Sequence, residues 1–214
     1  MSPPATPDPA ATVILLREGD PFDVLMVERN GRGMFGSMLV FPGGRVDSED
    51  VPEGFDTADD VPHRNAAIRE LAEETGILLT PHGAVASQTI DGRATAASSL
   101  VLVSRWVTPE FAPRRFDTRF YLASCDDPPD VVIDGNELVG HAWLGPEEAL
   151  NRTEKGDARM VLPTISHLRW LCRRSSVEEA FESAHGADAR TLVKPSLVED
   201  GSLIPILLPA EADE

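Results

Sequence analysis

Apolar residues in the first third of the chain gather in short runs that are separated by turn-forming residues. Two such runs, at residues 12–17 and 23–29, are joined by Glu-Gly-Asp-Pro-Phe, which predicts a hairpin-like pair of strands. A third run, at residues 37–44, predicts a strand that stops at Pro-Gly-Gly. Residues 47–62 are rich in Asp, Pro and Gly, so we expect a loop there.

Later segments add strands and helices in mixed order. Around residue 120, Phe116, Thr118 and Phe120 alternate with polar neighbours, which is strand periodicity. The remaining patterns predict strands and helices in the following segments: strands at 99–107, 115–123, 141–144 and 202–209, and helices starting at 146, 162 and 176. Mixed strands with a few helices predict an α+β or layered α/β/α domain.

The sequence predicts one domain with a disordered tail at each end. Residues 1–12 and 210–214 have a composition typical of disordered tails, and no linker divides residues 13–209. No segment reaches the ~18 consecutive apolar residues of a membrane span, and the first residues lack a signal-peptide pattern. Cys125 and Cys172 are too few for a disulfide framework, so we expect reduced thiols and a cytoplasmic protein.

Acidic residues outnumber basic ones by 36 to 19, for a net charge of −17. That balance argues against a nucleic-acid partner, which would require a basic surface. It also means that an anionic substrate must be received by local basic side chains or bound cations, because the overall field repels it.

Three glutamates crowd one predicted helix. Glu70, Glu73 and Glu74 fall within about a 100° arc, with Ile68 and Leu71 roughly opposite and able to face a core. Such like-charge pairs destabilise a helix, although an arginine at position 69 can offset part of the repulsion. Two interpretations follow: a solvated helix face, or a site for Mg²⁺ or Mn²⁺, which prefer carboxylate oxygens.

The residues around the glutamates favour the metal. Residues 69–77, Arg-Glu-Leu-Ala-Glu-Glu-Thr-Gly-Ile, match the second half of the Nudix hydrolase signature at every fixed position, and Gly44 matches its opening glycine. After five intervening residues, 45–49, Asp50 stands in place of the motif's glutamate, and an insertion at residues 51–61 lengthens the loop. Residues 40–50, 114–123 and 194–209 resemble the Nudix branch that includes the acyl-coenzyme A diphosphatases.

This resemblance implies a Nudix α/β/α sandwich with a mixed central sheet, with the motif helix on one side and C-terminal helices on the other. It implies that Glu70, Glu73 and Glu74 bind Mg²⁺ or Mn²⁺ for catalysis and that Arg69 orients a glutamate through a salt bridge. Glu137, in a later loop, is either a further ligand or general base or an ordinary loop glutamate.

Phosphate binding calls for arginines, whose planar fork matches phosphate oxygens. We expect the substrate to be bound by residues near the motif and the later strand: Arg29, Arg32, Gly43, Gly44, Arg45 and Arg119.

The resemblance implies a diphosphatase acting on a nucleoside diphosphate-linked small molecule, with coenzyme A or acyl-coenzyme A leading. ADP-ribose, a dinucleotide or a nucleotide sugar are alternatives, and so is a module that senses a nucleotide without cleaving it. We expect no membrane partner, and a homodimer as the commonest symmetric assembly. The insertion 51–61 is either a tolerated surface loop or an acidic flap that selects among substrates.

Overall fold

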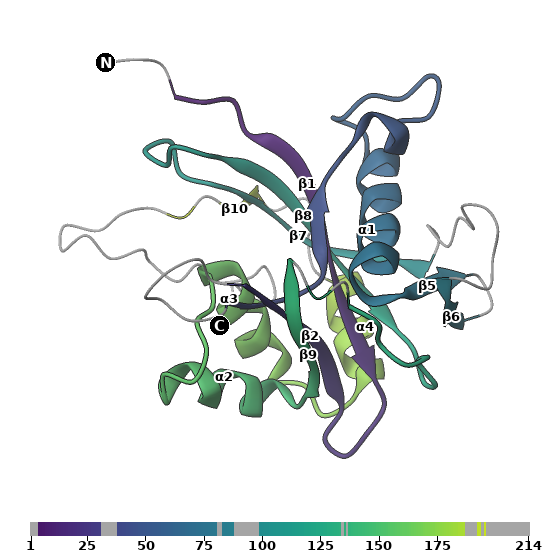
Figure 1. Ribbon diagram of the computed structural model, residues 1–214, viewed down its shortest axis with the longest axis vertical. Helices are drawn as coiled ribbons and strands as arrows, with labels where there is room; N and C mark the ends of the chain where they lie inside the picture. The colour runs from purple at the N-terminus through teal and green to yellow at the C-terminus, as the bar shows by residue number, and fades with distance from the viewer. Residues whose placement is uncertain are drawn as a thin grey trace.

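The structure is a computed structural model that describes residues 4–30, 38–80, 83–87, 99–133, 135, 137–186, 192–193 and 195 (Figure 1). The predicted strand at 202–209, the predicted tail at 210–214 and Arg32 lie outside the described residues. Within the described part, no helix combines the length and the apolar character needed to span a membrane.

Strands and helices alternate in the mixed order that the sequence predicts. The strands are β1 (Asp8–Arg17), β2 (Asp23–Arg29), β3 (Met38–Val40), β4 (Gly43–Arg45), β5 (Ile77–Thr80), β6 (Gly83–Ala86), β7 (Val101–Val107), β8 (Phe116–Ser124), β9 (Leu138–Leu144) and β10 (Leu192–Val193). The helices are the 3₁₀ turn η1 (Ser48–Asp50), α1 (Asp60–Thr75), α2 (Pro146–Glu154), α3 (Leu162–Leu171) and α4 (Val177–Gly186).

The central sheet is mixed and splits at its middle. Its order is β10-β7-β8-β1-β2-β3, with β4 also paired to β1 and β9 to β2, and β1 runs parallel to β8. The β1–β2 hairpin is confirmed, but the two strands pair only next to their turn, where Leu16 faces Val24 and Arg17 faces Asp23. Beyond that point β1 continues beside β4 and β8, whereas β2 continues beside β3 and β9. The split opens the space that becomes the site.

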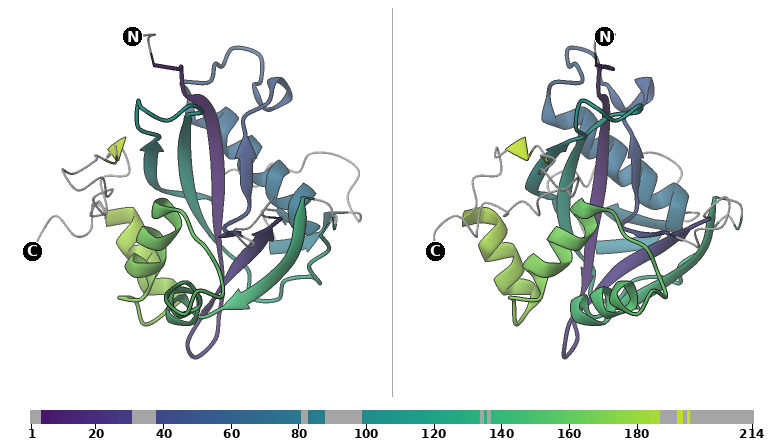
Figure 2. Two further views of the ribbon diagram at one scale, coloured as in Figure 1. Left: turned by 60° about the vertical axis from the view of Figure 1, so that its left-hand side comes forward. Right: turned by 90° about the vertical axis from the view of Figure 1, so that its left-hand side faces the viewer.

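Side-chain alternation along β1 produces the two layers on either side of the sheet. Ile14 and Leu16 pack with α2, α3 and α4, whereas Val13 and Leu15 pack with α1 and β5. Figure 2 shows α1 on one side of the sheet and α3 and α4 on the other. The predicted α/β/α sandwich with a mixed central sheet is therefore confirmed.

Three boundaries differ from the sequence-based prediction. Strand β1 begins at Asp8, so the predicted disordered tail at 1–12 is wrong for its last five residues, which pair with β4 and β8. The predicted strand at 37–44 is two short strands, because β3 pairs with β2 and β4 with β1 on opposite sides of the split. The predicted loop at 47–62 contains η1 and the first turn of α1.

Helix α1 carries the glutamates at its C-terminal end. It ends at Gly76, whose φ of 71° is the left-handed conformation that glycine adopts without strain. The insertion 51–61 joins η1 to the opposite, N-terminal end of this helix (Figure 1). Glu73 lies 13 residues beyond the start of the helix at Asp60, which corresponds to about 20 Å along the axis.

Candidate active site

A cavity of about 1010 Å³ lies where the sheet splits. One end is charged and the other is mostly apolar. The charged end, which we call the carboxylate end, is lined by Arg29, Gly43, Gly44, Arg45, Glu70, Glu73, Glu74 and Glu137. The apolar end is lined chiefly by Met38, Val40, Phe41, Trp106, Phe116, Phe120, Val161, Leu162 and Pro163.

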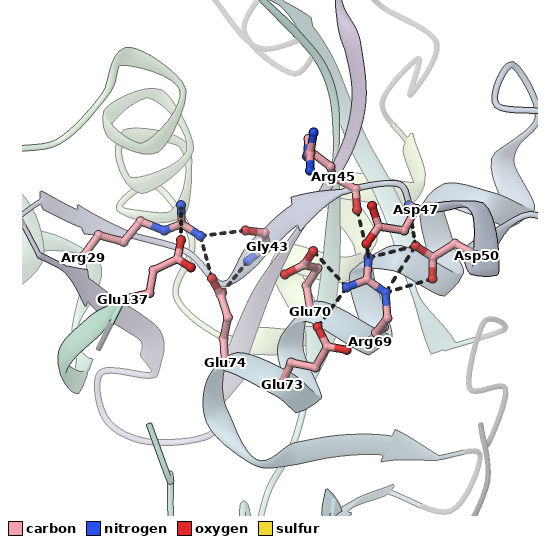
Figure 3. Close-up of polar contacts among 10 residues, drawn as sticks. All are labelled: Arg29, Gly43, Arg45, Asp47, Asp50, Arg69, Glu70, Glu73, Glu74 and Glu137. Atoms are coloured by element: carbon pink, nitrogen blue, oxygen red, sulfur yellow. Dashed lines mark hydrogen bonds and ion pairs between the residues drawn. The ribbon is translucent and has the colours of Figure 1, made fainter. Parts of the chain in front are cut away.

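Arg69 organises the carboxylate end from behind the cavity wall (Figure 3). Its Nη1 donates to Glu70 Oε1 at 3.0 Å and to Glu73 Oε2 at 2.9 Å. Its Nη2 donates to the backbone carbonyl oxygen of Arg45 at 2.9 Å. One guanidinium therefore forms the predicted salt bridge with a glutamate and positions two of the three motif glutamates. It also links α1 to β4.

Asp50 is the main partner of Arg69. Arg69 Nη2 lies 2.8 Å and Nε 3.1 Å from the Asp50 carboxylate oxygens. The Asp50 side chain is 2% exposed and also accepts the backbone N–H of Asp47. These hydrogen bonds raise the pKa of Arg69 above its ordinary value. A shorter carboxylate therefore occupies the motif position, five intervening residues beyond Gly44, and pairs with the motif arginine despite the insertion that follows.

A second arginine holds the remaining carboxylates. Arg29 Nη2 donates to Glu74 Oε1 at 2.7 Å, and Arg29 Nη1 lies 3.1 Å from Glu137 Oε1 (Figure 3). Glu74 also accepts the backbone N–H of Gly43 at 2.8 Å. The fold thus brings Glu137, from the segment just before β9, to the same cavity wall as the helix glutamates.

The two glycines before the motif are required by close approach. A β-carbon on Gly44 would lie 2.2 Å from Glu70 Oε1, inside the carboxylate that it faces. A β-carbon on Gly43 would lie 2.4 Å from the carbonyl oxygen of Ala11 on the neighbouring strand. Both glycines let β4 fit between β1 and the glutamate helix.

Two of the carboxylates are partly removed from water. Burial raises the pKa of Glu70, although Arg69 opposes the shift, and burial raises the pKa of Glu74 against its contacts with Arg29 and Gly43. Glu73 and Glu137, by contrast, are 60% and 67% exposed. The site therefore combines two fixed carboxylates with two that can reorient.

These carboxylates fit a hard divalent cation by their chemistry. All donors are carboxylate oxygens, the ligands that Mg²⁺ and Mn²⁺ prefer, and the four negative charges exceed the two arginines that offset them. As arranged in the described residues, no three of them converge on one point, because Arg29 and Arg69 draw them into two groups. An ion would have to draw the exposed carboxylates away from these arginines.

The predicted phosphate-binding residues divide in two. Arg29, Arg45, Gly43 and Gly44 line the cavity. Arg119 does not: its guanidinium donates to the carbonyl oxygens of residues 58 and 59 and to the Asp60 carboxylate, at the far end of α1. Arg119 anchors the end of the insertion and does not line the cavity in this arrangement.

The sequence-based prediction missed the apolar end of the cavity. Trp106 on β7, Phe120 on β8 and Phe41 after β3 are each less than 7% exposed and form its floor. Arg114 lies over the Phe116 ring, 5.6 Å from its centroid, at the same end. Only strand alternation in β7 and β8 could have indicated that Trp106 and Phe120 share a face.

Comparisons with known proteins agree with this arrangement. A family model described as NUDIX domain matches residues 6–164. The crystal structure of a NUDIX hydrolase from Alicyclobacillus acidocaldarius superposes with a TM-score of 0.68 and 27% identity, covering 83% of this chain and 96% of that one.

Two curated relatives are more informative about sequence. A Caenorhabditis elegans protein named Putative nudix hydrolase 7 is 30% identical over 69% of this chain and 55% of its own length. The Homo sapiens acyl-coenzyme A diphosphatase NUDT19 is 32% identical over 39% of this chain and 23% of its own length. The chain thus spans about half or less of these two relatives.

Proposed function

The chain belongs to the Nudix family, and on that premise we propose that it is a divalent-metal-dependent diphosphatase acting on a nucleoside diphosphate derivative. The observation that carries the proposal is the carboxylate end of the cavity. Four carboxylates and two arginines, Arg29 and Arg45, face a space large enough for a nucleotide-sized ligand. A solvated helix face has no reason to line a cavity in this way.

The carboxylates Glu70, Glu73 and Glu74 would hold Mg²⁺ or Mn²⁺. When bound, the ion lowers the pKa of a coordinated water and neutralises charge on the phosphates. Arg69 fixes Glu70 and Glu73 in position, and Asp50 in turn fixes Arg69.

The reaction requires one bond to form and one to break. Water attacks a phosphorus atom of the diphosphate, a new phosphorus–oxygen bond forms, and the bridging phosphorus–oxygen bond breaks with its electron pair on the departing phosphate. The Glu137 carboxylate takes the proton that the attacking water loses, because it is mostly exposed and lines the cavity beside Arg29. Arg29 and Arg45 bind the phosphate oxygens.

Coenzyme A or acyl-coenzyme A is the favoured substrate among the nucleoside diphosphate derivatives. The apolar end gives the cavity room for an acyl chain on the second group, and NUDT19, one of the relatives, is an acyl-coenzyme A diphosphatase. Cleavage would yield adenosine 3′,5′-bisphosphate and a 4′-phosphopantetheine. ADP-ribose, dinucleotides and nucleotide sugars carry polar second groups that this end would accept less readily.

A substrate panel tests the proposal directly. Purified protein with added Mg²⁺ or Mn²⁺ should hydrolyse at least one of coenzyme A, acyl-coenzyme A, ADP-ribose, a dinucleotide and a nucleotide sugar. Glu73→Gln and Glu74→Gln should each lower kcat by at least about a hundredfold, since even the partners of metal ligands matter by 10- to 100-fold. Glu148→Gln, on the exposed face of α2, is the matched control and should leave the rate unchanged.

Two results would count against the proposal. No turnover of any compound, with metal binding demonstrated, would favour a module that senses a nucleotide. Unchanged turnover in both glutamate variants would contradict the assignment of Glu73 and Glu74 as metal ligands.

A further inference from the structure

A buried histidine stands directly behind the apolar end of the cavity. His167 on α3 is fully buried, and its ring contacts three aromatic residues that line the cavity. It stacks on Phe120 with ring centroids 4.4 Å apart and planes at 28°. Its centroid lies 5.9 Å from that of Trp106 and 6.2 Å from that of Phe41. One side chain therefore touches all three parts of the aromatic floor.

A chain of hydrogen bonds fixes this histidine and the tryptophan together. Trp106 Nε1–H donates to Ser104 Oγ at 3.0 Å, and Ser104 Oγ lies 2.8 Å from His167 Nε2. His167 Nδ1 lies 2.7 Å from the carbonyl oxygen of Pro163. A carbonyl oxygen only accepts, so Nδ1 carries the ring proton and Nε2 accepts the proton of the Ser104 hydroxyl. Donors and acceptors match at every step.

This chain determines what the floor presents to a ligand. The indole N–H of Trp106 and both ring nitrogens of His167 form hydrogen bonds inside the protein. The floor therefore presents only carbon atoms to the cavity. A polar group placed against it would lose its hydrogen bonds to water without replacement, which costs binding energy. An apolar group loses nothing and gains buried area.

We propose that Ser104 and His167 are positioning residues that hold Trp106 and Phe120 as an apolar floor, and that this floor selects substrates with an apolar second group. The proposal rests on the proposed function, because its occupant is the acyl chain of an acyl-coenzyme A. Neither residue touches the reacting atoms. A histidine that only stabilised the core would affect all substrates equally.

Two thioesters that differ only in chain length test the proposal. Acetyl-coenzyme A and hexanoyl-coenzyme A differ by four methylenes, each worth up to about fourfold in kcat/KM when buried. The wild-type protein should prefer the hexanoyl form, mainly through KM. Ser104→Ala leaves the Trp106 N–H and His167 Nε2 without their partner, and His167→Phe keeps a ring but removes both of its hydrogen bonds. Each should reduce the hexanoyl preference about fivefold.

Tyr121→Phe is the matched control. Tyr121 is the neighbour of Phe120 on β8 but faces the α1 side, and its hydroxyl donates to Asp60 at 2.7 Å. The substitution removes one buried hydroxyl group, as Ser104→Ala does, without touching the cavity floor. Stability should fall comparably in both variants, while the hexanoyl preference should fall only in Ser104→Ala.

Binding of the same thioesters in EDTA, by calorimetry, separates this proposal from the proposed function. If the wild-type protein hydrolyses neither thioester but binds the hexanoyl form more tightly, and the two variants lose that preference, acyl-coenzyme A is not a substrate but the positioning role stands. If the wild-type protein shows no hexanoyl preference in either assay, the positioning role is overturned whatever the activity. It is equally overturned if Tyr121→Phe lowers the preference as much as Ser104→Ala.

Discussion

The carboxylate end and the apolar end of the cavity differ in what holds their side chains. At the carboxylate end, Arg69 and Arg29 hold four negatively charged groups by ionic hydrogen bonds, and Glu73 and Glu137 are largely exposed. At the apolar end, His167 and its partners form a neutral chain that is closed to water. At the carboxylate end a bound cation can replace an arginine as the partner of a carboxylate. At the apolar end every hydrogen-bonding group is already paired inside the protein, so a ligand has no contact to replace.

This contrast separates adaptable from rigid parts of one site. Exposed ionic contacts are weak, so an ion or a phosphate can displace them at little cost. Buried neutral hydrogen bonds are costly to break because the freed groups find no water. We expect substitutions to act at the carboxylate end through charge and at the apolar end through shape.

The largest effect is expected from Arg69→Ala. Removing the guanidinium leaves the buried Asp50 carboxylate without its cation, which typically destabilises a protein by about 3–5 kcal/mol. The free energy of unfolding in urea measures the loss. Arg152→Ala removes an exposed pair with Glu148 and should cost less than about 1 kcal/mol. Equal losses in the two variants would mean that the carboxylate end is held no more firmly than a surface pair.

Acid should destabilise the apolar end through His167. Burial lowers the pKa of this histidine to about 4 from an ordinary 6.5, so the unfolded chain takes up a proton first as pH falls. Stability is therefore lost between pH 6.5 and 4, by up to about 3 kcal/mol from this group.

The measurement compares unfolding free energies of wild type and His167→Phe from pH 7 to 4.5. The variant should be less stable at pH 7 but should lose less on acidification, because phenylalanine does not titrate. Parallel pH profiles would show that His167 is not held neutral by its surroundings.

Gly44→Ala should weaken metal binding with a smaller effect on folding. The new methyl would occupy the position of the Glu70 carboxylate, which must swing away from its place beside Arg69. We expect Mn²⁺ affinity, measured by calorimetry, to fall about 10- to 100-fold. Gly145→Ala is the control, since its nearest contact would be an ordinary 3.6 Å to Pro21. Unchanged Mn²⁺ affinity in Gly44→Ala would mean that Glu70 is not a ligand.

The smallest effect is expected from shortening the insertion. The structure favours the tolerated-loop alternative over an acidic flap, because no residue of 51–61 lines the cavity and the loop leads to the far end of α1. Replacing residues 52–57 with a short Gly-Ser turn keeps the contacts of Arg119 with residues 58 and 59. Relative rates among substrates should stay within about twofold, as for distant independent sites. A larger change in those ratios would support the alternative that the insertion is an acidic flap.

Local patterns predicted much of the fold. Apolar runs separated by turn residues located β1 and β2, and alternation located β8. The patterns did not reveal that β1 leaves β2 to run parallel to β8, because alternation shows which residues share a face but not which strand lies beside them. For the same reason the tail prediction ended too late, since the first residues of β1 are ordered by pairing partners more than 100 residues away.

The sequence by itself determined the three helix glutamates of the carboxylate end. Glu70, Glu73 and Glu74 lie on one helix, where their spacing dictates that they share a face whatever surrounds them. Only the tertiary structure decided what those carboxylates meet. Asp50 and Glu137 reach the two arginines through the path of their loops. The apolar floor gathers Phe41, Trp106 and Phe120 from the segment after β3, from β7 and from β8, with His167 of α3 behind it. A helix's geometry is local, whereas a cavity exists only after distant segments have packed.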